Sequence, residues 1–285
     1  MRKKKISIVT INFNNAEGLR KTLASVAVQT YSNIEHVIVD AASTDVSVEI
    51  IKEYASTSSH SVIWSSEKDK GIYDGMTKGV KKATGDYVWI LNSGDCAAAP
   101  DVVEKMMTIL NDEKIDILLG NIVRILPNNK KQYAPLPVKR TKGENPRLME
   151  VSMLTFYSAT IPQDAAFIRR ELFDTYRYYD DTMKICADWK LYLNMIALNG
   201  VRPMYVNIDV VLFDMTGVSN TDNERLKAEK RAYLEEVLPA SVLKDYDAYA
   251  FPIHQYERLK KYHLWPIVYF MERVLFKLNK WGVLK

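Results

Sequence analysis

Cysteine is scarce in this sequence of 285 residues, and long apolar runs are missing. The two cysteines, Cys96 and Cys186, lie far apart without metal-ligand spacing, so neither a disulfide framework nor a zinc site is indicated. No run approaches the roughly 18 apolar residues of a transmembrane helix. The opening Met1-Arg2-Lys3-Lys4-Lys5 leads directly into a strand-like run, without the apolar stretch of a secretory signal. These absences predict a cytoplasmic protein.

A net positive charge is also missing from most of the chain, although the formal net charge of the whole is +4. Residues 251–285 hold seven Lys or Arg and two Glu, a net charge of +5, which leaves the remainder near −1. A nucleic-acid-binding domain would spread its basic residues over one face, so we predict no nucleic-acid partner. The first predicted strand is not followed by G-x-G-x-x-G, which argues against a dinucleotide oxidoreductase.

Apolar, β-branched runs alternate with segments of helical periodicity in the first 120 residues. Strands are predicted at residues 6–11, 35–40, 61–64, 87–91 and 115–120, and helices at residues 17–30, 48–54, 74–83 and 100–110. This alternation predicts an α/β fold with a mainly parallel sheet flanked by helices. The second half is less regular, with a loop or hairpin at 127–147, helices at 183–198 and 223–238, and a strand at 204–213.

Polar and acidic residues follow four of the predicted strands. They are Thr10 and Asn12, then Asp40, then Asp69 and Gly71, and finally Asn92, Ser93 and Asp95. The carboxyl ends of parallel strands share one edge of a sheet, which is where ligands of α/β proteins bind. Carboxylates gathered there repel one another unless a cation or a donor-rich ligand is present. Each Asp at a helix start can instead be a helix cap.

The order of these segments resembles glycosyltransferase family 2, nucleotide-sugar enzymes with the GT-A fold, over about residues 5–220. Residues 39–45, Val-Asp-Ala-Ala-Ser-Thr-Asp, resemble the V-D-x-x-S-T-D motif. Residues 67–79 resemble the D-x-G-x-Y-D-A-M-N-K-G signature of a polysaccharide-synthesis subgroup, with Gly75 and Thr77 replacing Ala and Asn. Residues 92–95 resemble the D-x-D region with only its last acid retained.

This resemblance implies a UDP- or GDP-sugar donor and a Mg²⁺ or Mn²⁺ ion held by Asp95. The residues expected to bind the nucleotide sugar are Thr10, Asn12, Asp40, Asp69, Gly71, Asn92, Ser93 and Gln163. One carboxylate suffices for the metal, because Mg²⁺ keeps several waters and takes the remaining ligands from substrate phosphates. The metal would then neutralise the departing diphosphate.

Sugar transfer with inversion also needs a base that deprotonates the acceptor hydroxyl. Residues 185–191 resemble the A-D-[YW] acceptor motif of the family, which makes Asp188 the predicted catalytic base. Asp164 is the rival base, and a plain helix cap is the alternative role for Asp188. Residues 216–219, Thr-Gly-Val-Ser, resemble a G-G-[IV]-S turn that closes over the diphosphate, or form an ordinary turn.

The C-terminal tail combines apolar and basic residues at helical spacing. Beyond Pro266, an apolar stripe is formed by Ile267, Met271, Val274, Leu278 and Trp281, with Arg273, Lys277 and Lys280 on the other side. This pattern is typical of an amphipathic helix that lies in a membrane interface beside anionic lipids. The alternative is a helix that packs on the body or on a partner subunit.

The sequence thus predicts a GT-A domain at residues 1–220, with a nucleotide-binding half (1–120) and an acceptor half (121–220), and a helical extension at 221–285. The expected activity is inverting sugar transfer from a UDP- or GDP-sugar to a saccharide or lipid-linked acceptor in surface polysaccharide synthesis. The expected location is the cytoplasm, peripherally on the inner face of the membrane.

Two alternatives to this activity remain open. A nucleotidyltransferase usually carries a Gly-rich, basic loop after its first strand, unlike Asn12-Phe13-Asn14-Asn15. A non-catalytic nucleotide-sugar-binding module would explain why Asn92 and Gly94 stand in place of acids.

Overall fold

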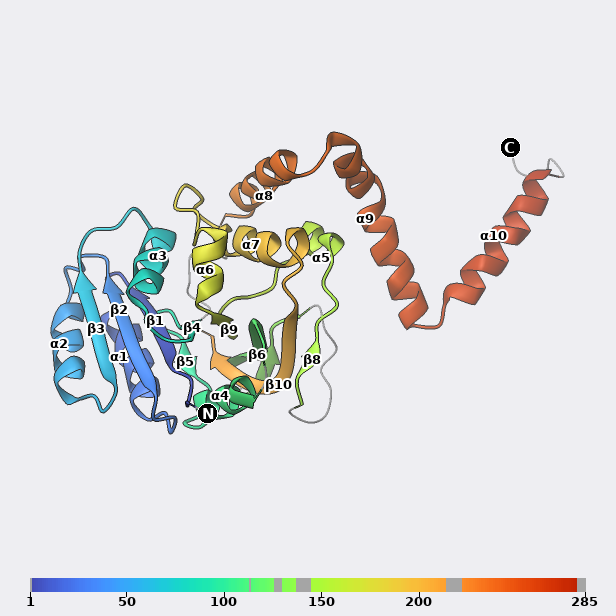
Figure 1. Ribbon diagram of the computed structural model, residues 1–285. Coiled ribbons are helices and arrows are strands. Elements are labelled where there is room, and N and C mark those ends of the chain that lie inside the picture. The colour runs from blue at the N-terminus through green and yellow to red at the C-terminus, as the bar shows by residue number, and fades with distance from the viewer. Residues whose placement is uncertain (1, 113, 126–129, 137–144, 214–221, 281–285) are drawn as a thin grey trace. The chain divides into compact units, whose positions relative to one another are not determined.

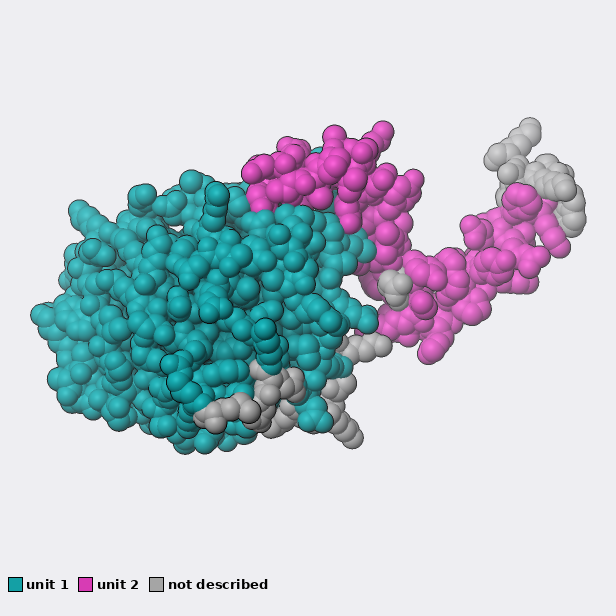
Figure 2. Space-filling model, in the orientation of Figure 1, with its two compact units in different colours: residues 1–231 teal, residues 232–285 magenta. Residues whose placement is uncertain are grey.

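A computed structural model describes residues 2–112, 114–125, 130–136, 145–213 and 222–280 (Figure 1). Its architecture is α/β, with one sheet flanked by helices, as the sequence predicts. The chain divides into two compact units, residues 1–231 and 232–285 (Figure 2). The predicted boundary near residue 220 falls outside the described residues, and the division observed lies within helix α8.

The first half of the sheet is parallel, in the order β3-β2-β1-β4. These strands are β1 (Ile6–Asn12), β2 (Ile34–Asp40), β3 (Ser61–Ser66) and β4 (Tyr87–Ile90). Their carboxyl ends are in register, with Asn12 opposite Asp40 and Asp40 opposite Ser66. The predicted strands of this half are therefore confirmed, and the polar residues that follow them meet at one edge.

Helices cover both faces of this half of the sheet. They are α1 (Ala16–Ala27), α2 (Ser47–Thr57) and α3 (Ile72–Lys82). On one face, Leu23 of α1 and Ile51 of α2 pack in one cluster with Ile38 of β2. On the other face, α3 approaches so closely that a Cβ on Gly79 would lie 2.3 Å from Val9 Cγ1. Glycine is therefore required where α3 crosses β1, the contact that places the start of α3 at the edge.

The second half of the sheet includes short antiparallel strands, although the long strands of the whole sheet run in one direction, as the sequence predicts. Its strands are β5 (Cys96–Ala97), β6 (Ile117–Ile125), β7 (Lys131–Tyr133), β8 (Arg147–Leu148), β9 (Ala166–Arg169) and β10 (Pro203–Leu212). Strand β10 is parallel to β6, whereas β9 is antiparallel to both β4 and β6 and lies between them. The chain enters β9 from the carboxyl edge and needs no crossover helix. A short apolar run has the same pattern in a parallel and in an antiparallel strand, so the sequence could not predict the direction of β9.

Five further α-helices in the described residues belong wholly or partly to the first unit. They are α4 (Val102–Asp112), α5 (Met153–Ser158), α6 (Glu171–Tyr176), α7 (Ala187–Tyr192) and α8 (Asn223–Val237). A π-helical turn, Leu193–Leu198, continues α7. The helix predicted over 183–198 begins only at Ala187, because the amides of Lys184 and Ile185 donate to the Glu229 carboxylate instead of to a helix.

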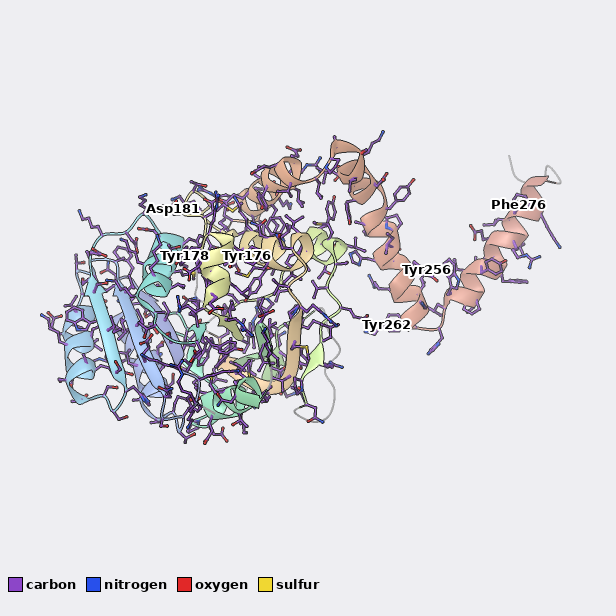
Figure 3. All side chains as sticks on the ribbon, viewed as in Figure 1. Tyr176, Tyr178, Asp181, Tyr256, Tyr262 and Phe276 are labelled. Carbon is purple, nitrogen blue, oxygen red and sulfur yellow. The ribbon has the colours of Figure 1, made fainter. Side chains whose placement is uncertain are left out.

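The second unit contains α9 (Ala240–Lys261) and α10 (Trp265–Lys280), both within the predicted helical extension. Tyr256 and Trp265 meet edge to face at 4.4 Å between ring centroids and join the two helices. Tyr262 and Phe276 expose their side chains (Figure 3). No helix in the described residues is long and apolar enough to cross a membrane.

Candidate active site

A cavity of about 990 Å³ opens at the carboxyl edge of the parallel strands. Ligand pockets in proteins typically have volumes of about 300–1,000 Å³, so its size suits a nucleotide sugar. We call it the large cavity. It brings together eight of the ten residues predicted for the site: Asn12, Asp69, Gly71, Asn92, Ser93, Asp95, Gln163 and Asp188.

Thr10 and Asp40 are the two predicted residues that do not line the large cavity. Both are fully buried. The Thr10 hydroxyl donates to the Leu91 carbonyl at 2.8 Å and thereby joins β1 to the end of β4. Thr10 therefore shapes the edge of the sheet, and its direct contact with a nucleotide stays a prediction.

Asp40 lies beneath the cavity wall, where its carboxylate is fully engaged. It accepts hydrogen bonds from Asn12 Nδ2 at 2.9 Å, from the Ser43 amide at 2.9 Å and from Ser66 Oγ at 2.6 Å. Burial opposes ionisation, but hydrogen bonds from Ser43, Ser66 and Asn12 outweigh it and lower the pKa of Asp40. Asp40 therefore orients Asn12 as an anion, and its direct contact with a base stays a prediction.

Three side-chain amide oxygens on the cavity wall are buried and have no hydrogen-bond partner among the described residues. They are Asn12 Oδ1, Asn92 Oδ1 and Gln163 Oε1. A buried acceptor without a partner costs about 1–3 kcal/mol, so this wall favours a ligand that brings donors or a cation. The Asn92 oxygen belongs to the same turn as Asp95, whose residue is 4% exposed and lines the cavity.

The described residues contain no group of three His, Cys, Asp or Glu side chains that would hold a metal ion by itself. A divalent cation here would depend on the Asp95 carboxylate, the Asn92 amide oxygen and oxygens from a ligand. These are the hard oxygen donors that Mg²⁺ and Mn²⁺ prefer, and Mg²⁺ sites commonly use one or two carboxylates with substrate phosphates. The residues present fit the predicted metal.

Asp69 and Gly71 form the turn before α3 at the rim of the large cavity. Gly71 adopts φ +133°, ψ 179°, a conformation that is essentially restricted to glycine. Its amide donates to Asp69 Oδ1 at 3.0 Å. Burial raises the pKa of Asp69 despite this hydrogen bond.

Asp188 lies in the first turn of α7 and is not the capping residue, a position that Cys186 occupies. The Tyr73 hydroxyl donates to the Ile185 carbonyl at 2.6 Å and also lies 3.1 Å from Asp188 Oδ1. Burial raises the pKa of Asp188, while the Trp189 amide, Tyr73 and Lys230 act in the opposite direction. Asp188 therefore lines the cavity with a carboxyl group whose pKa is raised.

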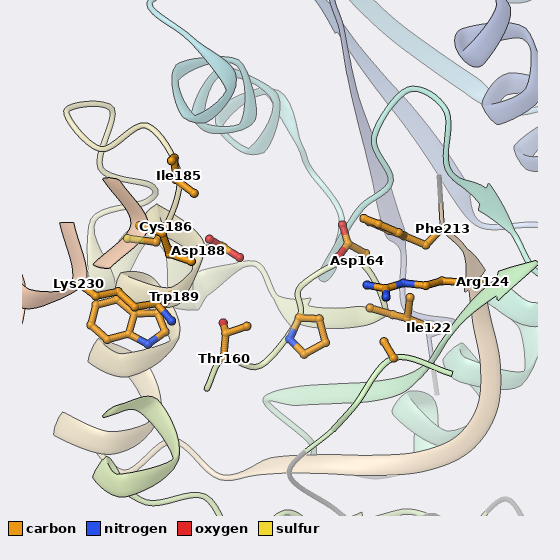
Figure 4. Close-up of a pocket in the computed structure, with 13 residues that line it drawn as sticks. Ile122, Arg124, Thr160, Asp164, Ile185, Cys186, Asp188, Trp189, Phe213 and Lys230 are labelled. Atoms are coloured by element: carbon orange, nitrogen blue, oxygen red, sulfur yellow. The ribbon is translucent and has the colours of Figure 1, made fainter. Parts of the chain in front are cut away.

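A second cavity of about 240 Å³ adjoins the first, and we call it the small cavity (Figure 4). Asp164, Ile185, Asp188 and Phe213 line both. Burial and the negative charge of Asp188 raise the pKa of Asp164 to about 6. Two carboxyl groups with raised pKa values thus lie where the cavities meet, an arrangement that suits one ionised base and one proton-bearing neighbour.

Tyr73, Arg124, Glu229 and Lys230 are site residues to which the sequence reading gave no role. Glu229 of α8 accepts from the Lys184 and Ile185 amides at 2.9 and 3.0 Å, which fixes the segment before Asp188. Tyr73 belongs to the 67–79 motif, so the sequence already contained a signal that could have marked it as a site residue. The predicted turn at residues 216–219 lies outside the described residues.

We expect Asp164→Asn to stabilise the fold above about pH 6 and to do so much less at pH 4. The raised pKa means that the folded state favours the protonated Asp164. The free energy of unfolding of the wild type therefore falls as the pH rises from near 4 through about 6, whereas Asn stays neutral at every pH. Because Asp164 is partly exposed, the gain at pH 8 should be about 1–3 kcal/mol. Urea unfolding at both pH values measures it, with exposed Asp174→Asn as the control. An equal effect at both pH values would contradict the shift.

The chain is similar to curated mycobacterial glycosyltransferases. It is 28% identical over 217 residues to an uncharacterized glycosyltransferase of Mycobacterium tuberculosis, covering 75% of this chain and 77% of the relative. It is also 28% identical over 225 residues to the PGL/p-HBAD biosynthesis glycosyltransferase of Mycobacterium bovis BCG, covering 78% and 82%.

Two solved structures have a similar fold. S. aureus TarS in complex with UDP superposes with a TM-score of 0.59 at 19% identity, covering 73% of this chain and 60% of that chain. The mannosyltransferase PcManGT of Pyrobaculum calidifontis, in complex with GDP-Man and Mn²⁺, gives 0.56 at 18% identity, covering 76% and 59%. The sequence model of Glycosyl transferase family 2 matches residues 7–177, more than half of the chain. With the GT-A architecture of its structural neighbours, this match shows that the chain belongs to glycosyl transferase family 2 and is a glycosyltransferase.

Proposed function

We propose that this glycosyltransferase moves a sugar, with inversion, from a UDP- or GDP-sugar to a hydroxyl of a saccharide or lipid-linked acceptor in surface polysaccharide synthesis. The observation that carries this proposal is the meeting of the two cavities at Asp164 and Asp188. A donor in the large cavity and an acceptor in the small one would face each other across these carboxyl groups. One solved neighbour binds UDP and another binds GDP-Man, so the proposed donor can carry either nucleotide.

In the proposed reaction Asp188 accepts the proton of the acceptor hydroxyl as its oxygen attacks the anomeric carbon. The bond from that carbon to the diphosphate breaks, and the electron pair leaves with the nucleoside diphosphate. Tyr73 holds Asp188 toward the cavity junction. Asp95 and the Asn92 amide oxygen would hold Mg²⁺ or Mn²⁺, which when bound supplies positive charge for the diphosphate.

A panel of nucleotide sugars, with and without Mg²⁺ or Mn²⁺, tests this function. We expect release of free UDP or GDP from one class of donor and stimulation by the metal. A nucleotidyltransferase would instead release pyrophosphate from a nucleoside triphosphate and a sugar phosphate. A binding module would bind a nucleotide sugar without turnover, and either outcome would overturn the proposal.

We also propose that α10 binds an anionic membrane surface. Its exposed apolar side chains include Ile267, Phe270, Met271 and Leu275, between 50% and 67% exposed. At 100° per residue these four lie within an arc of about 140°, and Arg273 and the exposed Phe276 lie outside it. The placements of Trp281 and of the Leu278 and Lys280 side chains fall outside the described residues. An apolar arc beside basic residues suits the boundary between head groups and acyl chains.

Replacing both Arg273 and Lys277 with Gln is expected to weaken binding to vesicles of anionic lipid about tenfold or more. Each basic residue near such a surface contributes about 1 kcal/mol. Co-sedimentation with vesicles containing phosphatidylserine measures the change, and exposed Lys21→Gln is the control. Equal binding to neutral vesicles, or a stable dimer in light scattering with no vesicle binding, would favour a packing role for α10.

A further inference from the structure

The small cavity has mainly apolar walls into which two cationic side chains project. Pro162, Trp189 and Phe213 supply apolar surface, and Arg124 of β6 and Lys230 of α8 supply the charges. In the view of Figure 4 the two cations lie on opposite sides, with Asp164 and Asp188 between them. Such a cavity matches an acceptor that has both an apolar part and a charged part.

The charge of Lys230 already interacts with neighbouring groups of the protein. Its Nζ lies 5.0 Å from the centroid of the Trp189 ring and donates to the Ala159 carbonyl at 3.4 Å. It also acts electrostatically on Asp188 and favours the ionised carboxylate there. Lys230 therefore serves the proposed base and needs no anion from a ligand.

Arg124, by contrast, has no anionic partner in the described part of the chain. Its Nε is buried without a hydrogen-bond partner. The guanidinium carbon lies 5.7 Å from the centroid of the Phe213 ring, so the group is held on an aromatic surface. A buried guanidinium donor that lacks an acceptor is costly unless a ligand provides one.

We propose that Arg124 binds an anionic group of the acceptor, a carboxylate or a phosphate, carried on an apolar body that contacts Trp189 and Phe213. The planar guanidinium matches both anions with two parallel hydrogen bonds. An anionic acceptor would otherwise be repelled by Asp188, and Arg124 offsets that repulsion. The inference rests on the proposed function, because it names the acceptor class of the same site.

Three small probes that share a phenyl ring test this inference: benzoate, phenyl phosphate and neutral benzyl alcohol. Binding is measured by ligand-observed NMR at saturating UDP or GDP with Mg²⁺, so that the nucleotide blocks the large cavity. We expect at least one anionic probe to bind wild-type protein about tenfold or more tightly than benzyl alcohol. Tighter binding of benzoate identifies a carboxylate acceptor, and tighter binding of phenyl phosphate identifies a phosphate.

Arg124→Gln is expected to lower the affinity for the preferred anionic probe about 10- to 100-fold and to change the affinity for benzyl alcohol less than about twofold. Arg124→Lys should retain part of the preference, and exposed Arg20→Gln all of it. The inference is overturned if wild-type protein binds all three probes equally or binds neither anion, a comparison that needs no variant. It is also overturned if Arg124→Gln weakens every probe alike. Failure of the proposed function would appear separately, as wild-type protein that releases no nucleoside diphosphate from any donor.

Discussion

Asp188→Asn is expected to lower kcat for sugar transfer about 10²- to 10⁴-fold, the usual contribution of a general base. Asn keeps the size of the side chain and an oxygen that still accepts from Tyr73, but it cannot take a proton from the acceptor hydroxyl. The dissociation constant of UDP or GDP should change less than about threefold. Steady-state assays and calorimetry with the nucleotide measure the two quantities.

The control for this variant is Asp174→Asn, which changes an exposed carboxylate on α6. Turnover of Asp188→Asn equal to wild type would eliminate Asp188 as the base, and a large loss only in Asp164→Asn would assign the role to Asp164. The pH profile adds a second criterion. Because burial raises the pKa of Asp188, activity should fall as the pH drops through a value above that of an ordinary Asp. Tyr73→Phe removes an interaction that lowers this pKa, so the acid limb should move to higher pH.

Asp95→Ala is expected to remove metal-stimulated turnover, a loss of about 10²-fold or more, because it deletes the one carboxylate of the predicted metal site. Asn92→Ala deletes a neutral oxygen and should lower the affinity for the metal ion only about 10-fold. Titration of turnover with Mn²⁺, together with Mn²⁺ binding followed by electron paramagnetic resonance, separates affinity from rate.

The matched control for the metal site is Asp101→Ala, which removes a half-exposed carboxylate that pairs with Lys105 on α4. Metal stimulation should be unchanged in this variant. If Asp95→Ala and Asn92→Ala show the same loss, the metal does not depend on a single carboxylate, and the proposed ligand set fails.

Much of the large cavity could be predicted from the sequence, because its residues follow strands or lie in short linear motifs. Asn12, Asn92 and Asp95 end parallel strands, so their meeting needs only the alternation of strands and helices. The sequence could not show that Asp40 is buried beneath the wall. That outcome depends on hydrogen-bond donors from three residues, two of which lie on other strands.

The small cavity was not predictable in the same way. Tyr73 and Asp188 are 115 residues apart, and Arg124 lies on a strand whose neighbours include the antiparallel β9. Strand direction sets which segments meet at this side of the edge, and an apolar pattern does not encode it. Glu229 reaches the start of α7 from 45 residues along the chain, at a position that carries only an ordinary helical charge pattern.

Strands from before and after residue 120 alternate within one sheet. Strand β9, from after that residue, pairs with β4 from before it, and β5, from before it, pairs with β10 from after it. A chain cut near residue 120 would leave each fragment with an unpaired strand edge and a strand that belongs to the other fragment's sheet. Chimaeras that graft a new acceptor specificity onto this enzyme should therefore exchange β5 and β9 as partners of the strands they join, because a single crossover point would divide one continuous sheet.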